Sequence, residues 1–183
     1  MSEVYEEALF RCTHDALVFA FNYQGQQGPR STMFVPPTGT GKGLSGVDGA
    51  AQAGFIMAVV ERLPRESRNI ITARFGNVQH DCPCCGQPTA GENWRLAVNN
   101  LSLCDELRDL PRNARLAAIQ RAMNLRHCDV STLSKDFGLS ERTLRHKIKQ
   151  VKERLFKIER KTLIQLDSLF SAVGLIPAPD KAQ

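Results

Sequence analysis

A short segment, His80-Asp-Cys82-Pro-Cys84-Cys85-Gly86, concentrates residue types that bind metal ions. Two thiolates at the spacing Cys-x-x-Cys, with a glycine that closes the turn, can hold one tetrahedral zinc ion. A structural zinc site needs four ligands, and the sequence has no second Cys-x-x-Cys pair. The segment therefore predicts a zinc site built on half of the usual ligand pattern.

Three sources can supply the other two zinc ligands: His80 with Cys84, or Cys104, or His127 with Cys128. A ligand set confined to one loop is crowded, whereas His127 and Cys128 would fasten the loop to the motif that follows them. The local assignment gives the site residues Cys82, Cys85, His80 and Cys84. A cysteine-rich loop without metal is the alternative.

The segment Pro37-Thr-Gly-Thr-Gly-Lys42-Gly43 resembles the phosphate-binding loop of nucleoside-triphosphate hydrolases. In that motif a Ser or Thr follows the lysine because its hydroxyl binds magnesium, and Gly43 has no hydroxyl. No strongly apolar strand precedes the loop, and no parallel sheet with a second acidic metal site fits the remaining sequence. The sequence favours a flexible loop with one lysine over a nucleotide site.

Residues 129–151 have the pattern of a helix-turn-helix. Leu133 and Phe137 are apolar and one turn apart, and Gly138 stands where a helix end favours a left-handed backbone. Ser140 suits the N-cap of the second helix. Apolar residues then recur in that helix at helical spacing: Leu144, Ile148 and Val151.

The opposite face of this second helix is polar and mostly basic. It carries Ser140, Arg142, Thr143, Arg145, His146, Lys147 and Lys149. Long cations on the outer face of such a helix suit insertion into the major groove of DNA. We predict that these residues bind double-stranded DNA, and a helical hairpin with a solvated basic face is the alternative.

Positive charge is concentrated in the same part of the sequence. The whole chain has a net charge of +5 and a pI near 9.0. Residues 121–161 contain 12 Lys or Arg and 5 Asp or Glu, whereas the remainder contains 12 and 14. This asymmetry is typical of a surface that releases counterions from phosphate, and an acidic protein surface is also a suitable partner.

The elements that position these residues are predicted to be helices, with no convincing strand pair, so the expected fold class is all-α. The expected helices are 3–21, 45–63, 65–75 (with Pro64 at its start), 94–107, 112–126 and the two helices of the helix-turn-helix, the second continuing to Phe170. Cys12 is expected in the core, and His14 is expected in solvent.

The expected organisation follows the order of these segments. An N-terminal helix (1–21) precedes a flexible Gly/Pro/Gln-rich loop (22–44), a helical body (45–126) with the cysteine knuckle at 80–91, the helix-turn-helix region with its long C-terminal helix (127–176), and a tail (177–183). The glycines and prolines of the loop are typical of a linker.

The N-terminus carries Glu3, Glu6 and Glu7 where a signal peptide carries positive charge. No apolar run reaches the length that spans a membrane. We therefore expect no membrane association and a cytoplasmic location, in which cysteines serve as free thiols or metal ligands rather than in disulfides.

Residues 43–63, GLSGVDGAAQAGFIMAVVERL, resemble the late-gene antitermination proteins Q of lambdoid phages. The shared features are Ser45-Gly46-x-Asp48, then Gln52-Ala53-Gly54-Phe55, then a cysteine knuckle, then C-terminal helices. Lambda-type members have two Cys-x-x-Cys pairs where this chain has one. The helix-turn-helix also looks like the C-terminal DNA-reading region of bacterial sigma factors.

This resemblance implies a transcription antiterminator that works in the cytoplasm of a bacterial host. Such a protein binds a DNA element overlapping a late promoter and engages RNA polymerase, with its sigma factor as a further partner. It then travels with the polymerase and narrows the RNA exit channel, so that terminator hairpins do not form. No covalent chemistry is required, so we expect no enzymatic activity. A promoter-binding repressor or activator with the same helix-turn-helix is the first alternative, and a small nucleotide hydrolase that uses Lys42 is the second.

Overall fold

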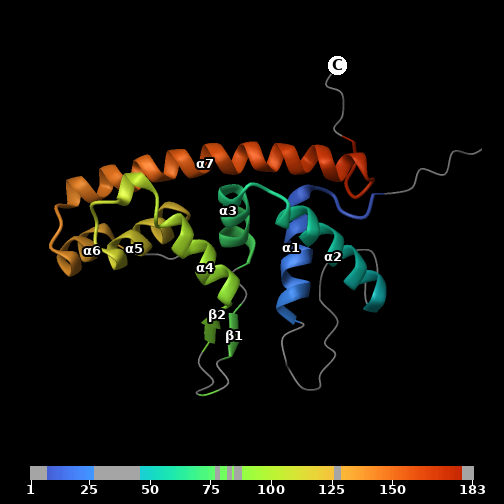
Figure 1. Cartoon of the computed structure of the whole chain (residues 1–183), viewed down its shortest axis with the longest axis horizontal. Helices are drawn as coiled ribbons and strands as arrows, with labels where there is room; N and C mark the ends of the chain where they lie inside the picture. Colours follow the sequence, from blue (N-terminus) through green and yellow to red (C-terminus); the bar gives the residue numbers. More distant parts are fainter. Residues whose placement is uncertain are drawn as a thin grey trace, which may run out of the picture. The chain divides into compact units, whose positions relative to one another are not determined.

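The computed structural model of the chain describes residues 8–26, 46–76, 79–81, 84, 88–125 and 129–178. Helices make up most of these residues, so the all-α class is confirmed (Figure 1). The chain divides into two compact units: the first comprises residues 1–61 and 161–183, and the second comprises residues 62–160. No helix among the described residues is long and apolar enough to cross a membrane. The phosphate-loop lookalike at 37–43 lies outside the described residues.

The first unit contains α1 (Thr13–Gln26), α2 (Gly46–Glu61) and the end of the long helix α7 (Glu141–Ala172). Helices α1 and α2 pack against each other. The buried side chains of the unit include Leu17, Ile56, Leu166 and Phe170. The organisation expected from the sequence, with segments in chain order, does not include this grouping, because the last turns of α7 belong to the same unit as the N-terminal helices.

The N-terminal helix begins later than the apolar spacing suggests, at Thr13 rather than near Glu3. Residues 8–12 are not helical. The backbone N–H of Phe10 donates to the carbonyl of Leu175 at 2.9 Å, and the Phe10 side chain is buried. Phe10 is therefore buried as part of an irregular segment that is hydrogen-bonded to Leu175, and Cys12 is exposed instead of buried. His14 is exposed, as expected.

The second unit begins with α3 (Arg65–Phe75), whose bounds agree with the sequence prediction. Pro64 occupies its N-cap, and Gly76 follows its last residue. Pro at a helix start removes an N–H that would have no intrahelical partner. The preceding helix α2 also lies within its predicted range.

A two-stranded antiparallel hairpin follows, formed by β1 (Gln79–Asp81) and β2 (Pro88–Ala90). The expectation of no strand pair is therefore wrong for this segment. Its register places His80 opposite Thr89. Residue pattern could not predict this hairpin, because each strand has three residues and only Thr89 belongs to the β-branched and aromatic types that mark strands.

The helix expected over 94–107 is two elements, α4 (Glu92–Leu101) and a 3₁₀ turn, η1 (Asp105–Leu107). The Ser102 hydroxyl donates to the carbonyl of Asn99 at 2.7 Å, which competes with continuation of the helix. Helix α5 (Arg112–Ala122) ends four residues before the predicted end at Arg126. It ends because Asn124 adopts a φ of 54°, a conformation that asparagine tolerates better than most residues.

Helix α6 (Val130–Phe137) is followed by a short turn and then by α7. Gly138 has a φ of 62°, and the N–H of Leu139 donates to the carbonyl of Ser134 at 3.0 Å, as in a Schellman end. Helix α7 is 32 residues long and ends at Ala172, two residues beyond the predicted end at Phe170. The first half of α7 closes the core of the second unit, which also includes Ile119, Leu133 and Leu144.

Candidate nucleic-acid interface

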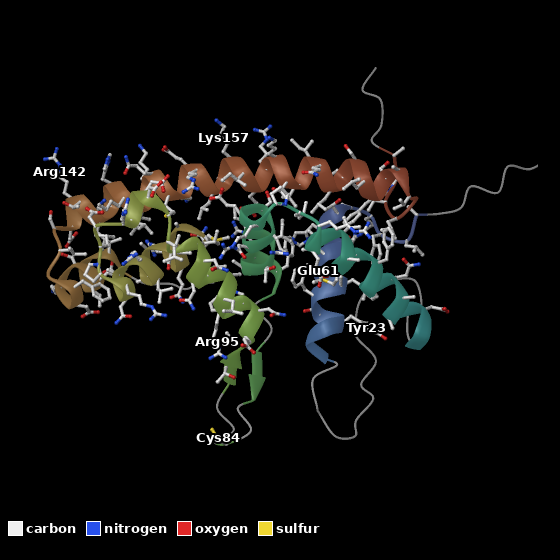
Figure 2. All side chains as sticks on the ribbon, viewed as in Figure 1. Tyr23, Glu61, Cys84, Arg95, Arg142 and Lys157 are labelled. Atoms are coloured by element: carbon white, nitrogen blue, oxygen red, sulfur yellow. The ribbon has the colours of Figure 1, made fainter. Side chains whose placement is uncertain are left out.

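The first turns of α7 have one buried face and one exposed face. Leu144, Ile148 and Val151 are buried in the core of the second unit. Of the residues predicted to bind DNA, the structure leaves six exposed: Ser140, Arg142, Thr143, Arg145, His146 and Lys149. Figure 2 shows Arg142 projecting from α7 away from α5 and α6. The helical phase inferred from the sequence is therefore the one that the structure adopts.

Lys147 does not lie on the outer face with these six residues, which corrects the sequence interpretation. Its Nζ donates to the Asp109 carboxylate at 2.6 Å and to the Glu106 carbonyl at 2.9 Å. The Lys147 side chain is only 16% exposed. Position 147 is at the edge of the buried face, where a lysine stem packs on the core and its ammonium finds acceptors nearby. We therefore leave Lys147 out of the interface.

The exposed cations have weak partners or none among the described residues. Arg142 forms no hydrogen bond or ion pair with any residue that the structure describes. Arg145 pairs with Glu141 at 3.1 Å and Lys149 with Glu153 at 3.9 Å, and all four side chains are exposed. Exposed pairs at i,i+4 contribute only about 0.3–0.5 kcal/mol, so a phosphate group can displace the carboxylate at low cost.

Two arginines, Arg74 and Arg154, form ion pairs that hold α7 to the body of the second unit. Arg74 of α3 donates from Nε and Nη2 to the two carboxylate oxygens of Glu159, each at 2.8 Å, and from Nη1 to the Met123 carbonyl. The hydrogen bond to Glu159 raises the pKa of Arg74. Arg154 of α7 binds Glu66 of α3 and donates to Glu106 at 2.8 Å. The sequence did not predict this role of Arg74 and Arg154, because the pattern of charges does not distinguish cations that pair within the fold from cations that face solvent.

Three carboxylates of the second unit have lowered pKa values. Partial burial raises the pKa of Glu106, but its own backbone N–H and the Arg154 charge outweigh burial, so the value lies below 4.5. The hydrogen bond from Lys147 lowers the pKa of Asp109, and the bond from the Ser131 hydroxyl lowers that of Asp129. Each carboxylate is therefore more acidic in the folded chain than in the unfolded chain.

These shifts predict that the second unit loses stability in acid. A lowered carboxylate pKa stabilises the fold fully above the unfolded values, 3.8 for Asp and 4.5 for Glu, and the effect is lost as pH falls through the folded values. Urea midpoints should be flat from pH 7 to about 5 and then fall. Glu106→Gln should reduce this fall, whereas Glu92→Gln, at an exposed position of α4, should keep it. If the urea midpoint falls equally steeply with pH in both variants, Glu106 does not contribute to the acid sensitivity of the second unit.

Most of the proposed zinc ligands lie outside the described residues: Cys82, Cys85, His127, Cys128 and the side chain of His80. Cys84 is exposed. Cys104, one of the alternative ligands, is half-buried, and burial together with its hydrogen bond to Glu106 raises the pKa of its thiol to about 11. No cluster of metal-binding side chains occurs among the residues that the structure describes. In the sequence, the Cys-x-x-Cys pair falls between the residues of β1 and those of β2.

Zinc at Cys82 and Cys85 stays a prediction that elemental analysis can test. Protein purified without chelator should contain about one zinc ion per chain, because one structural site takes one ion. Metal binding to deprotonated thiolates also stabilises the fold, so Cys82→Ser should lower the melting temperature more than Cys12→Ser does. Metal-free protein with the same melting temperature in both variants would identify the segment as a loop without metal.

Comparison with known proteins gives no family for this chain, since no protein-family model and no curated protein sequence matches it.

Proposed function

We propose that this protein is a phage-type transcription antiterminator that binds double-stranded DNA through α6 and α7 and then acts on RNA polymerase. The observation that carries the DNA-binding part is the exposed row of Arg142, Arg145 and Lys149 opposite the buried row of Leu144 and Ile148. Long cations held outward by a packed helix suit the phosphates and guanine edges of a major groove.

The turn between α6 and α7 supports the same function. The left-handed Gly138 lets the chain reverse in a few residues, and Ser140 precedes the first residue of α7. Arg142 and Thr143 are exposed at the N-terminal end of α7, next to this turn. In helix-turn-helix proteins, the N-terminal residues of the second helix contact base edges. Arg142 and Arg145 suit base or phosphate contacts, whereas Lys149 suits a phosphate.

The polymerase part of the proposal rests on the resemblance of residues 45–55 to the Q-type antiterminators. Most of this segment lies in α2, which belongs to the first unit, whereas the residues proposed to bind DNA belong to the second unit. Gly54 and Phe55 are exposed, and a Cβ added at Gly54 would meet no described atom within 4 Å other than those of its chain neighbours and the adjacent backbone of α2. A protein that stays with the polymerase after promoter escape needs a second surface of this kind.

Transcription in vitro through a terminator tests the proposal. The template carries the cognate promoter and DNA element followed by a terminator, and the control template lacks the element. Readthrough should rise when the protein is added before the paused polymerase is released, and only on the template with the element. A change in the amount of initiation with an unaltered readthrough fraction would instead identify a promoter-binding regulator.

A further inference from the structure

A second group of exposed residues lies further along α7, and we call it the distal stripe. It consists of Lys152, Phe156, Lys157 and Arg160. No stripe cation forms a hydrogen bond or ion pair with any described residue, whereas Arg154 and Glu159, on the same turns, bind α3. Figure 2 shows Lys157 on the same side of α7 as Arg142. The fold itself therefore makes no use of the stripe's charges.

Most of the distal stripe lies beyond the reach of a single major groove. Phe156 follows Arg142 by 14 residues, which at 1.5 Å per residue is about 21 Å along the helix. A major groove is only about 12 Å wide. Lys152 is only about 4.5 Å further along the helix than Lys149, the last residue of the DNA interface. DNA bound by the first turns of α7 therefore leaves Phe156, Lys157 and Arg160 free for another partner.

Phe156 indicates what kind of partner this is. Its side chain is 62% exposed, although a phenylalanine gains much more from burial than from contact with water. Duplex phosphates offer no apolar surface to cover the ring. A protein surface does, and aromatic and arginine side chains are enriched among the residues that dominate protein interfaces. Three cations and one exposed carboxylate, Glu153, lie on the turns around the ring, so the net charge there is positive and favours an acidic partner surface.

The stripe is also held rigidly for binding. The opposite face of the same turns has Val151 and Leu155 buried in the core. The Arg74–Glu159 and Arg154–Glu66 pairs fix these turns to α3. A surface held in place in this way loses little conformational entropy on binding.

We infer that the distal stripe binds an acidic protein segment that carries an apolar residue to cover Phe156. This inference rests on the proposed function in taking bacterial RNA polymerase as the protein that supplies the segment. It assigns one partner surface to the second unit, separate from the DNA-binding turns of α7.

Binding of the full chain to purified RNA polymerase tests the inference. One variant reverses the stripe's charges (Lys152→Glu, Lys157→Glu, Arg160→Glu). The matched control reverses three exposed arginines elsewhere in the second unit (Arg95→Glu, Arg108→Glu, Arg112→Glu), so the two proteins have equal net charge. The stripe variant should bind polymerase about 10-fold more weakly than the control, and Phe156→Ala should bind more weakly than wild type. Equal affinities of the two triple variants, or no binding by wild type, would overturn the inference.

A photo-crosslinking residue at position 156 identifies what covers the stripe. The expected product joins the chain to an acidic, partly apolar segment of polymerase, and a product with DNA or with a second copy of the chain would overturn the inference. Readthrough by the wild-type chain separates the two proposals. If readthrough rises while the triple variants bind polymerase equally, only the inference fails. If readthrough stays unchanged while the stripe variant alone loses binding, only the proposed function fails.

Discussion

Leu144→Ala should destabilise the second unit by about 2–5 kcal/mol, because it removes most of a buried leucine side chain and leaves a cavity. Leu144 is 1% exposed and belongs to the cluster that joins α5, α6 and α7. Phe156→Ala, a larger truncation on the same helix, should change stability by less than about 0.5 kcal/mol because position 156 faces solvent.

Urea unfolding followed by tryptophan fluorescence measures both variants. Trp94 is the single tryptophan, and its indole N–H donates to the Ala73 carbonyl at 3.0 Å inside the second unit. Its emission therefore reports unfolding of the unit that contains α6 and the start of α7. Equal destabilisation by the two variants would mean that the helical phase of α7 is wrong, and with it the assignment of its exposed face.

The Arg142→Ala, Arg145→Ala double variant should lose at least about 30-fold in affinity for its specific DNA. Each arginine that reads a base contributes about 1–3 kcal/mol, and neither residue has a structural partner stronger than an exposed i,i+4 pair. Lys149→Ala should weaken binding by about the same factor for every duplex sequence, because a lysine contacts phosphate as a point charge. This factor should be smaller than the loss in the double variant.

An Arg108→Ala, Arg112→Ala variant serves as the control, since it removes two exposed arginines from elsewhere in the second unit. Its affinity should stay within a few-fold of wild type in a fluorescence anisotropy titration at fixed salt, because distant exposed charges are largely screened. Both double variants should unfold at nearly the wild-type urea concentration. If the Arg142→Ala, Arg145→Ala variant binds DNA as tightly as this control, the two arginines do not contact DNA.

Helix type and helical phase could be predicted where one face is buried. Helix α3 and the exposed face of α7 follow directly from the period of their apolar residues and from Pro64 and Gly138. The prediction failed where a few hydrogen bonds decide the outcome. The Ser102 hydroxyl ends α4, a left-handed Asn124 ends α5, and a three-residue strand pair forms with almost no apolar pattern.

The sequence predicted which face of α7 is exposed, but not which of its cations are free and which form ion pairs within the fold. Lys147 and Arg154 have the same residue types and spacing as their exposed neighbours. Their roles depend on Glu106, Asp109 and Glu66, which are distant in the sequence. Such contacts are set by the packing of η1 and α3 against α7, and no local pattern encodes them. The same limit applies to Phe10, whose contact with Leu175 spans nearly the whole chain.

The salt dependence of duplex DNA affinity tests the central claim most directly. Each phosphate neutralised by a cation contributes about −0.9 to the slope of log Kobs against log salt concentration. If Lys149 neutralises a phosphate while Arg142 and Arg145 read bases, the wild-type slope should be about −1 or steeper. Lys149→Ala should make the slope shallower by about 0.9, whereas the Arg142→Ala, Arg145→Ala variant should keep a slope near that of wild type. A wild-type slope near zero, or one that Lys149→Ala leaves unchanged, would contradict DNA binding by α7.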